Sequence, residues 1–121
     1  MRGIRGAITV EENTAEAVMS ATQEVVKAML EANDIRTEDI GAAIFTATED
    51  ITAVFPAKGA RALPGFELVP LFDARQMDVD GALDHCIRVL LRSIYFNFHW
   101  ECVILSENIL HWVDVVLSHV T

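Results

Sequence analysis

Among the side chains of this sequence, those of the arginines have the clearest capacity for chemistry. Arg88 lies inside the apolar run at 87–91, where a cation must reach solvent along its stem, pair with an acid or serve a binding site. A guanidinium stays charged and can bind a carboxylate through two parallel hydrogen bonds. Arg5, by contrast, has the features of an ordinary surface charge when it is taken alone.

The other reactive side chains lack the spacing that metal binding or nucleophilic catalysis requires. Cys86 and Cys102 are too few for a disulfide scaffold and have no metal-ligand spacing, and Cys86 is interpreted as a small buried hydrophobe. His85 has no partner in sequence that suggests a general base, and the acidic run at 78–84 indicates a solvated face. We therefore expect neither a metal nor a cofactor.

Composition excludes several classes of protein. The chain has 121 residues, of which 52% are hydrophobic and 22% charged, which is typical of a single globular domain with its own core. Its net charge of −9 would repel nucleic acid and an acidic membrane surface. The first residues have no apolar run long enough for a signal peptide, and no uncharged apolar stretch is long enough to span a membrane. The expected location is the reducing cytoplasm.

Hydrophobic periodicity predicts the elements that must position these side chains. Residues 2–10 end in β-branched residues and indicate a strand, and Asn13 with Glu16 forms a capping-box-like pair that would begin a helix. Asp50 is expected to cap a short helical stretch that Pro56 interrupts. The helix at 14–32 has one buried face, carrying Val18, Ala21, Val25, Ala28, Met29 and Ala32. Further expectations are a buried strand at 41–48, a helical turn at 57–63, a strand at 67–72 that Pro70 confines to an edge or bulge, and a segment at 82–92 that is either helix or strand. These elements describe a compact α/β or α+β domain.

The last 29 residues differ in composition from the rest of the chain. All nine lysines and arginines lie at or before Arg92, whereas residues 93–121 contain both tryptophans, the only tyrosine and three of the four histidines. Two hypotheses stay open: natural divergence of a hydrophobic tail that packs on the sheet or at an interface, or a shifted reading frame in the coding sequence after about Arg92.

Several segments, in order and spacing, resemble the monofunctional AroH-class chorismate mutases. The resemblance covers residues 1–92 of a single domain at 1–121. Its segments are RGIRGAITVE at 2–11, FTATED at 45–50, AVFPAKGAR at 53–61, VPL at 69–71 running through QMDV at 76–79, and CIRVL at 86–90.

The resemblance implies a fold and an activity. The expected fold is a small mixed β-sheet flanked by helices, and three copies would form a pseudo-α/β barrel with active sites in the clefts between subunits. The expected reaction is the rearrangement of chorismate to prephenate on the route to phenylalanine and tyrosine, which needs no cofactor. Two alternatives stay open: a non-catalytic or impaired trimeric homologue that only binds the ligand, and a YjgF-like trimeric deaminase.

The resemblance also assigns roles to individual residues. Arg88 matches the cation at the ether oxygen of chorismate, and Arg5 matches a residue that binds a substrate carboxylate. Phe55 and Lys58 match an apolar wall and a source of positive potential in the pocket. The segment that would line the substrate ring consists of Phe72, Asp73, Ala74, Arg75 and Gln76.

The chain departs from the family pattern at Gln76, at Asp73 and in the tail. Gln76 replaces a glutamate, so it can still accept a hydrogen bond from the substrate hydroxyl but lacks the negative charge. Asp73 stands where some members have a small thiol or polar side chain. In the tail, residues 102–105 could supply the last strand, which would place Ile104 where a substrate-binding tyrosine is expected, and the family's C-terminal arginine has no counterpart.

Overall fold

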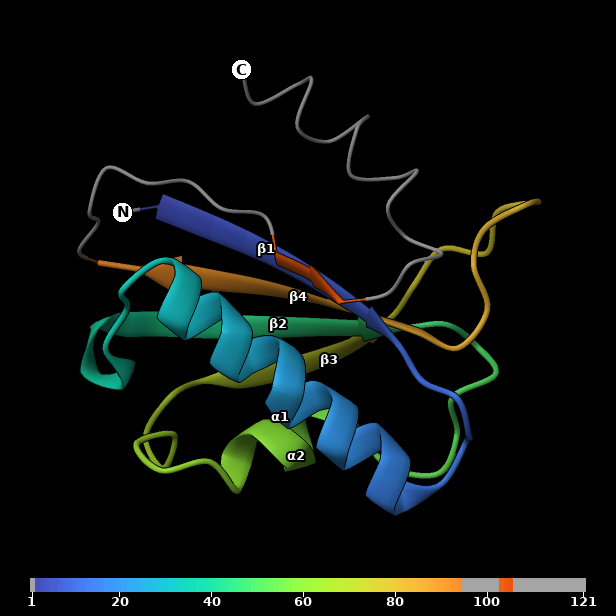
Figure 1. Ribbon diagram of the computed structural model, residues 1–121, viewed down its shortest axis with the longest axis horizontal. Helices are drawn as coiled ribbons and strands as arrows, with labels where there is room; N and C mark the ends of the chain where they lie inside the picture. The colour runs from blue at the N-terminus through green and yellow to red at the C-terminus, as the bar shows by residue number, and fades with distance from the viewer. Residues whose placement is uncertain (1, 95–102, 106–121) are drawn as a thin grey trace.

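The computed structural model describes residues 2–94 and 103–105 and folds them into one mixed sheet with two helices (Figure 1). The strands are β1 (Arg2–Thr9), β2 (Ile40–Ala47), β3 (Leu71–Arg75), β4 (Cys86–Ser93) and β5 (Val103–Leu105), and the helices are α1 (Ala15–Ala32) and α2 (Pro56–Arg61), with a short 3₁₀ helix at Thr37–Asp39. None of the described helices is long and apolar enough to cross a membrane.

The sheet has the strand order β3-β2-β4-β1-β5. The three central strands are antiparallel neighbours, because β4 pairs with β1 on one side and with β2 on the other. The two edge strands pair in parallel, β3 with β2 and β5 with β1. This arrangement confirms the mixed α+β sheet, and Val103–Leu105 forms a strand within the segment that the sequence suggested for it.

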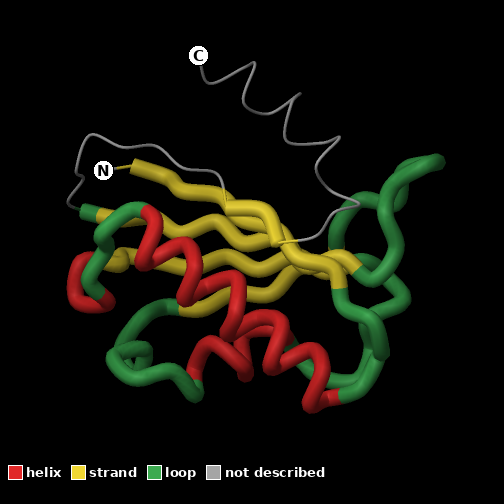
Figure 2. Tube along the Cα trace, in the orientation of Figure 1, coloured by secondary structure: helices red, strands yellow, loops and turns green. Residues whose placement is uncertain are grey.

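Both helices lie on one face of the sheet (Figure 2). The buried side of α1 carries Val18, Val25 and Met29, which pack against the sheet's buried residues, among them Phe45 and Ile87. The helices also approach each other closely: a Cβ built on Gly59 of α2 would lie 2.8 Å from the carbonyl oxygen and 2.9 Å from the Cα of Met19 in α1. Only glycine allows this contact, because a side chain there would meet backbone atoms.

Several predicted boundaries need correction. The N-cap of α1 is Thr14, whose hydroxyl accepts a hydrogen bond from the Ala17 N–H at 3.2 Å, so the pairing of Asn13 with Glu16 was wrong. Asp50 caps no helix, because α2 begins only at Pro56 and has Phe55 at its N-cap position. The strand predicted at 67–72 instead runs from Leu71 to Arg75.

The structure confirms one prediction on this part of the chain and resolves a segment that was left open. Pro70 immediately precedes β3, and β3 is an edge strand of the sheet, where a residue without an N–H is tolerated. The segment at 82–92, left open between helix and strand, forms the central strand β4. Its alternation of buried and partly exposed residues matches a strand covered by helices on one face.

Candidate active site

A cleft of about 610 Å³ lies beside the edge strand β3, against the loop that joins β2 to α2. We call it the Phe55 cleft. It brings together five residues that the family resemblance assigns to substrate binding, namely Phe55, Lys58, Asp73, Ala74 and Arg75. The rest of its lining consists of Ala47, Thr48, Ile51, Thr52, Ala53, Val54 and Pro56.

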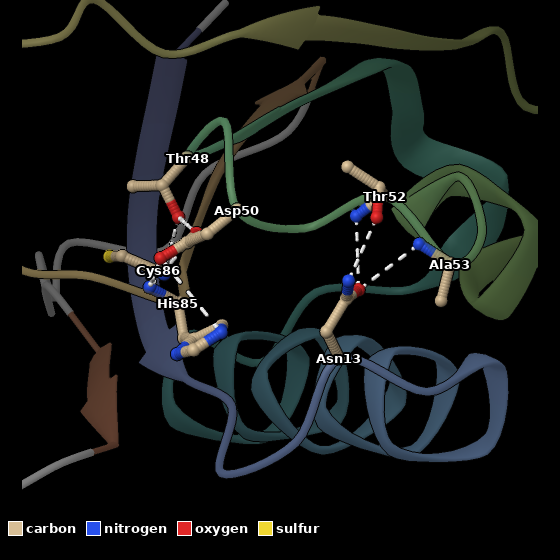
Figure 3. A network of polar contacts seen from close by, with 7 residues as sticks. All are labelled: Asn13, Thr48, Asp50, Thr52, Ala53, His85 and Cys86. Carbon is tan, nitrogen blue, oxygen red and sulfur yellow. Dashed lines mark hydrogen bonds and ion pairs between the residues drawn. The ribbon is translucent and has the colours of Figure 1, made fainter.

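Asn13 fixes the loop that forms the wall of the Phe55 cleft. Its Oδ1 accepts hydrogen bonds from the N–H groups of Thr52 and Ala53, each at 3.0 Å, and its Nδ2 donates to the Thr52 hydroxyl at 2.8 Å (Figure 3). A residue just ahead of α1 therefore holds a loop almost 40 positions later in the chain. The side chain that the sequence indicated as a helix cap instead positions the cleft.

Asp73 joins the cleft floor to the first turn of α2. Its Oδ1 accepts a hydrogen bond from the Ala57 N–H at 3.0 Å, an N–H that Phe55 at the N-cap has no side-chain acceptor to satisfy. Burial raises the pKa of the Asp73 carboxyl, and the hydrogen bond from Ala57 opposes this only in part. The cleft therefore combines the cations Lys58 and Arg75 with one carboxyl group whose ionised form is disfavoured by burial.

Arg5 and Arg88 lie on the sheet face opposite the helices, which we call the arginine face. Alternate residues of a strand point to opposite faces, and Ile4 of β1 and Ile87 of β4 are buried in the helix-covered core. Their neighbours Arg5 and Arg88 therefore lie on the other face. Because Arg5 pairs with Leu90 and Arg88 with Ala7, the two arginines are diagonal neighbours, a relation that places residues typically about 7–8 Å apart.

The two arginines differ in their surroundings. Arg5 is exposed, whereas Arg88 is half-buried in the middle of the sheet, in register with Ala7 on one side and Thr46 on the other. Burial raises the pKa of the Cys86 thiol on the same strand, and the positive charge of Arg88 partly offsets that rise. Arg88 is therefore a cation held at a defined place on a largely apolar face.

The structure leaves the nine predicted residues in separate groups. Arg5 and Arg88 do not line the Phe55 cleft. Phe72 pairs with Ile44, which is itself in register with Leu90, so Phe72 belongs to the arginine face, where the residue is 64% exposed. Asp73 and Arg75 of the edge strand β3 line the cleft from the opposite face, and Ala74, which shares the face of Phe72, lines the cleft as well.

Gln76 lies apart from both groups, in a second cavity of about 360 Å³. Its Oε1 is buried and has no hydrogen-bond partner among the residues that the structure describes. Among those same residues, no cluster of three or more histidine, cysteine or acidic side chains could hold a metal ion. The acidic residues of this cavity are Glu49, Asp50, Asp78, Asp80 and Asp84.

Sequence reasoning missed a hydrogen-bonded network between the end of β2 and the start of β4 (Figure 3). The Asp50 carboxylate accepts hydrogen bonds from the Thr48 hydroxyl and, at 2.9 and 3.2 Å, from the His85 N–H. Burial alone would raise the pKa of Asp50, but these hydrogen bonds and the nearby His85 ring outweigh it, so the pKa is lowered. A threonine two residues before an aspartate, directly after a buried strand, is a signal for such side-chain bonds to loop backbone.

Comparisons with known proteins place this geometry in context. Residues 1–99 match the family model described as chorismate mutase type I. The chain is 55% identical over 91 residues to "Chorismate mutase AroH" from Thermus thermophilus, which covers 74% of each chain. It is 43% identical over 91 residues to "Chorismate mutase AroH" from Bacillus subtilis (strain 168), covering 75% of this chain and 72% of that one. The solved structure "Chorismate mutase from Clostridium thermocellum Cth-682" superposes with a TM-score of 0.83 at 37% identity, covering 88% of this chain and 96% of the other.

Proposed function

This chain belongs to the chorismate mutase type I family and is a chorismate mutase, and we propose that its Arg88 and Arg5 promote the rearrangement of chorismate to prephenate. One observation carries the assignment of residues: Arg88 is half-buried at a fixed register position in the centre of the sheet, with the exposed Arg5 diagonally beside it. Arg5 and Arg88 offer two positive charges to a substrate that carries two carboxylates, and the exposed Arg92 adds a third on the same face.

The reaction explains why cations suffice. The rearrangement is a one-step pericyclic shift within a single molecule, so it requires no nucleophile, metal or cofactor. The ether oxygen gains electron density as its C–O bond breaks, and a guanidinium held beside that oxygen stabilises the transition state more than the substrate. We assign this role to Arg88 and the binding of a carboxylate to Arg5, whose charged fork suits that group.

The Phe55 cleft would supply the restriction of substrate shape. Phe55 offers an apolar surface against the ring, and Lys58 and Arg75 add positive potential for a dianionic ligand. Holding the side chain of chorismate over its ring in a chair-like geometry lowers the entropic part of the barrier. Gln76 would accept a hydrogen bond from the substrate hydroxyl only after its side chain turns, because its Oε1 is buried beside the second cavity.

We further propose a homotrimer whose sites lie between subunits. Support comes from the sheet itself: both described helices cover one face, while the arginine face carries exposed apolar residues such as Phe72 at 64%, and Arg5, Arg88 and Phe72 do not line the Phe55 cleft. A second copy that places its cleft against this face would bury the apolar surface and complete the site. We assign the trimer to the cytoplasm, with chorismate rather than nucleic acid or membrane as its partner, in aromatic amino-acid biosynthesis.

The test is a direct assay of the purified chain. Chorismate would be added and the loss of its ultraviolet absorbance followed, with prephenate identified as the product and the oligomeric state measured by light scattering. We expect rapid conversion by a trimer. Binding of chorismate without turnover by a folded trimer would contradict the proposal and favour a non-catalytic homologue, and turnover of an imine instead would favour a deaminase.

A further inference from the structure

The network around Asp50 joins the strand that carries Arg88 to the loop that forms the Phe55 cleft. Beyond the bonds that Asp50 accepts, the Thr48 hydroxyl accepts a hydrogen bond from the Cys86 N–H at 3.0 Å, and the Thr48 N–H donates to the Cys86 carbonyl at 3.0 Å. Figure 3 shows Thr48 and Asp50 turned toward His85 and Cys86. Asp50 is thus bonded directly to His85 and, through Thr48, to Cys86, the residue at which β4 begins.

His85 has a backbone conformation that requires such support. Its φ of 49° lies in the left-handed region, which a residue with a Cβ adopts only where its surroundings hold it there. The N–H of this residue bonds to both oxygens of Asp50, and its carbonyl accepts from the Val10 N–H at 2.7 Å. The turn at His85 therefore depends on the Asp50 carboxylate on one side and on the segment after β1 on the other.

The position of this turn determines where Arg88 lies. Strand β4 begins at Cys86, and Arg88, two residues later, shares the arginine face with it. On the other side of the network, Ile51 and Thr52 follow Asp50 directly and line the Phe55 cleft. A shift of Asp50 would consequently move the start of β4 and the wall of the cleft relative to each other.

We propose that Asp50 is a positioning residue for the chorismate mutase reaction, acting through Thr48 and the His85 backbone to hold Arg88 in place. Asp50 does not touch the substrate in this account. The charged and titratable groups around it include the His85 ring, whose Nε2 lies 3.9 Å from its Oδ2, the Cys86 thiol, and the other carboxylates of the second cavity. This inference rests on the proposed role of Arg88.

The decisive variants change hydrogen bonds while keeping shape. Asp50→Asn removes an acceptor and the charge. Thr48→Val removes the hydroxyl but keeps the branched side chain, whereas Thr48→Ser keeps the hydroxyl. We expect Asp50→Asn and Thr48→Val to lower kcat by about 10-fold or more, toward the roughly 100-fold that a misplacement of 1 Å can cost. KM should change by a smaller factor than kcat, because Arg88 acts mainly in the transition state, whereas Thr48 itself lines the Phe55 cleft. Thr48→Ser should recover most of the rate.

The matched control is Asp80→Asn, which removes an exposed carboxylate from the same acidic cavity and should leave kcat unchanged. All rates would be measured well below the melting temperature of each variant, with folding checked by circular dichroism. A wild-type chain without chorismate mutase activity would overturn the proposed function itself. With an active wild type, unchanged kcat in Asp50→Asn and Thr48→Val would overturn the role of Asp50. The role of Asp50 would also be overturned if Thr48→Ser lost as much of kcat as Thr48→Val, or if the loss of kcat vanished on cooling. Such a loss would reflect stability alone.

Discussion

The Phe55 cleft and the arginine face are built by different means. The position of Arg5 and Arg88 follows from strand register, in which backbone pairing and the alternation of side chains leave little freedom. The cleft depends instead on individual side chains that bond to distant backbone, Asn13 to the loop at 52–53 and Asp73 to α2. The cations proposed for catalysis are therefore held mainly by the sheet, with the Asp50 network supporting the start of β4, whereas the shape of the cleft depends almost entirely on single polar residues.

The largest effect is expected on the arginine face. Arg88→Ala removes the cation proposed for the ether oxygen and should lower kcat by at least the roughly 10²–10³-fold that loss of one such donor costs. The trimer should persist, because the register of β4 does not depend on this side chain. Turnover and light scattering would be measured together.

The control is Arg92→Ala, an exposed arginine on the same face of the same strand, which should keep most of the activity. Near-normal turnover by Arg88→Ala would refute the role of Arg88. Equal losses in both variants would show that the face needs positive charge in general.

A moderate effect on stability and KM is expected where α1 and α2 pack together beside the cleft. Gly59→Ala would place a methyl group against the backbone of Met19, and such overpacking typically costs about 1–3 kcal/mol of stability. Because α2 carries Lys58, we expect a lower melting temperature and a higher KM with a smaller change in kcat. Gly41→Ala is the control, since a Cβ there would lie 3.7 Å from its nearest neighbour, the Arg92 carbonyl. A Gly59→Ala variant as stable as the control would show that the helices can separate without consequence for the cleft.

The smallest effect is expected at Asp73. Its pKa is raised by burial, so the ionised carboxylate costs stability near neutral pH, and this cost disappears as the pH falls through the raised pKa. Asp73→Asn keeps an oxygen that can accept from the Ala57 N–H but carries no charge. We expect a higher melting temperature at neutral pH, a difference that vanishes in acid, and a KM for chorismate lower by roughly twofold to fivefold because one repulsive charge is lost. A KM that rises would instead indicate that Asp73 itself binds the substrate.

Most of the sheet and the long helix could be predicted from the sequence, because their burial patterns are local and periodic. Spacing at three and four residues predicted α1, and Pro70 predicted the edge character of β3. The ambiguity at 82–92 followed from a short apolar run, which only the pairing of β4 with both β1 and β2 resolves.

The cleft was less predictable, because its key contacts join residues far apart in the chain. Asn13 bonds to residues 39 and 40 positions away, and Asp50 bonds to one 35 positions away. Local sequence patterns do not reveal such distant partners, and both residues were therefore interpreted as helix caps. The site residues came from the family resemblance. The two hypotheses for residues 93–121, natural divergence and a shifted reading frame, both stay open. Most of that segment lies outside the described residues, and Ile104 lies on β5.

In the proposed trimer, the Phe55 cleft of one subunit works with the arginine face of another. The most direct test co-expresses two differently tagged variants, Arg88→Ala and the double variant Lys58→Ala with Arg75→Ala, and purifies the chains that carry both tags. Each mixed trimer should contain about one intact site in three, so chorismate turnover should recover to about a third of the wild-type rate although each parent is nearly inactive. Activity no higher than the average of the two parents, in trimers shown to contain both chains, would contradict the claim.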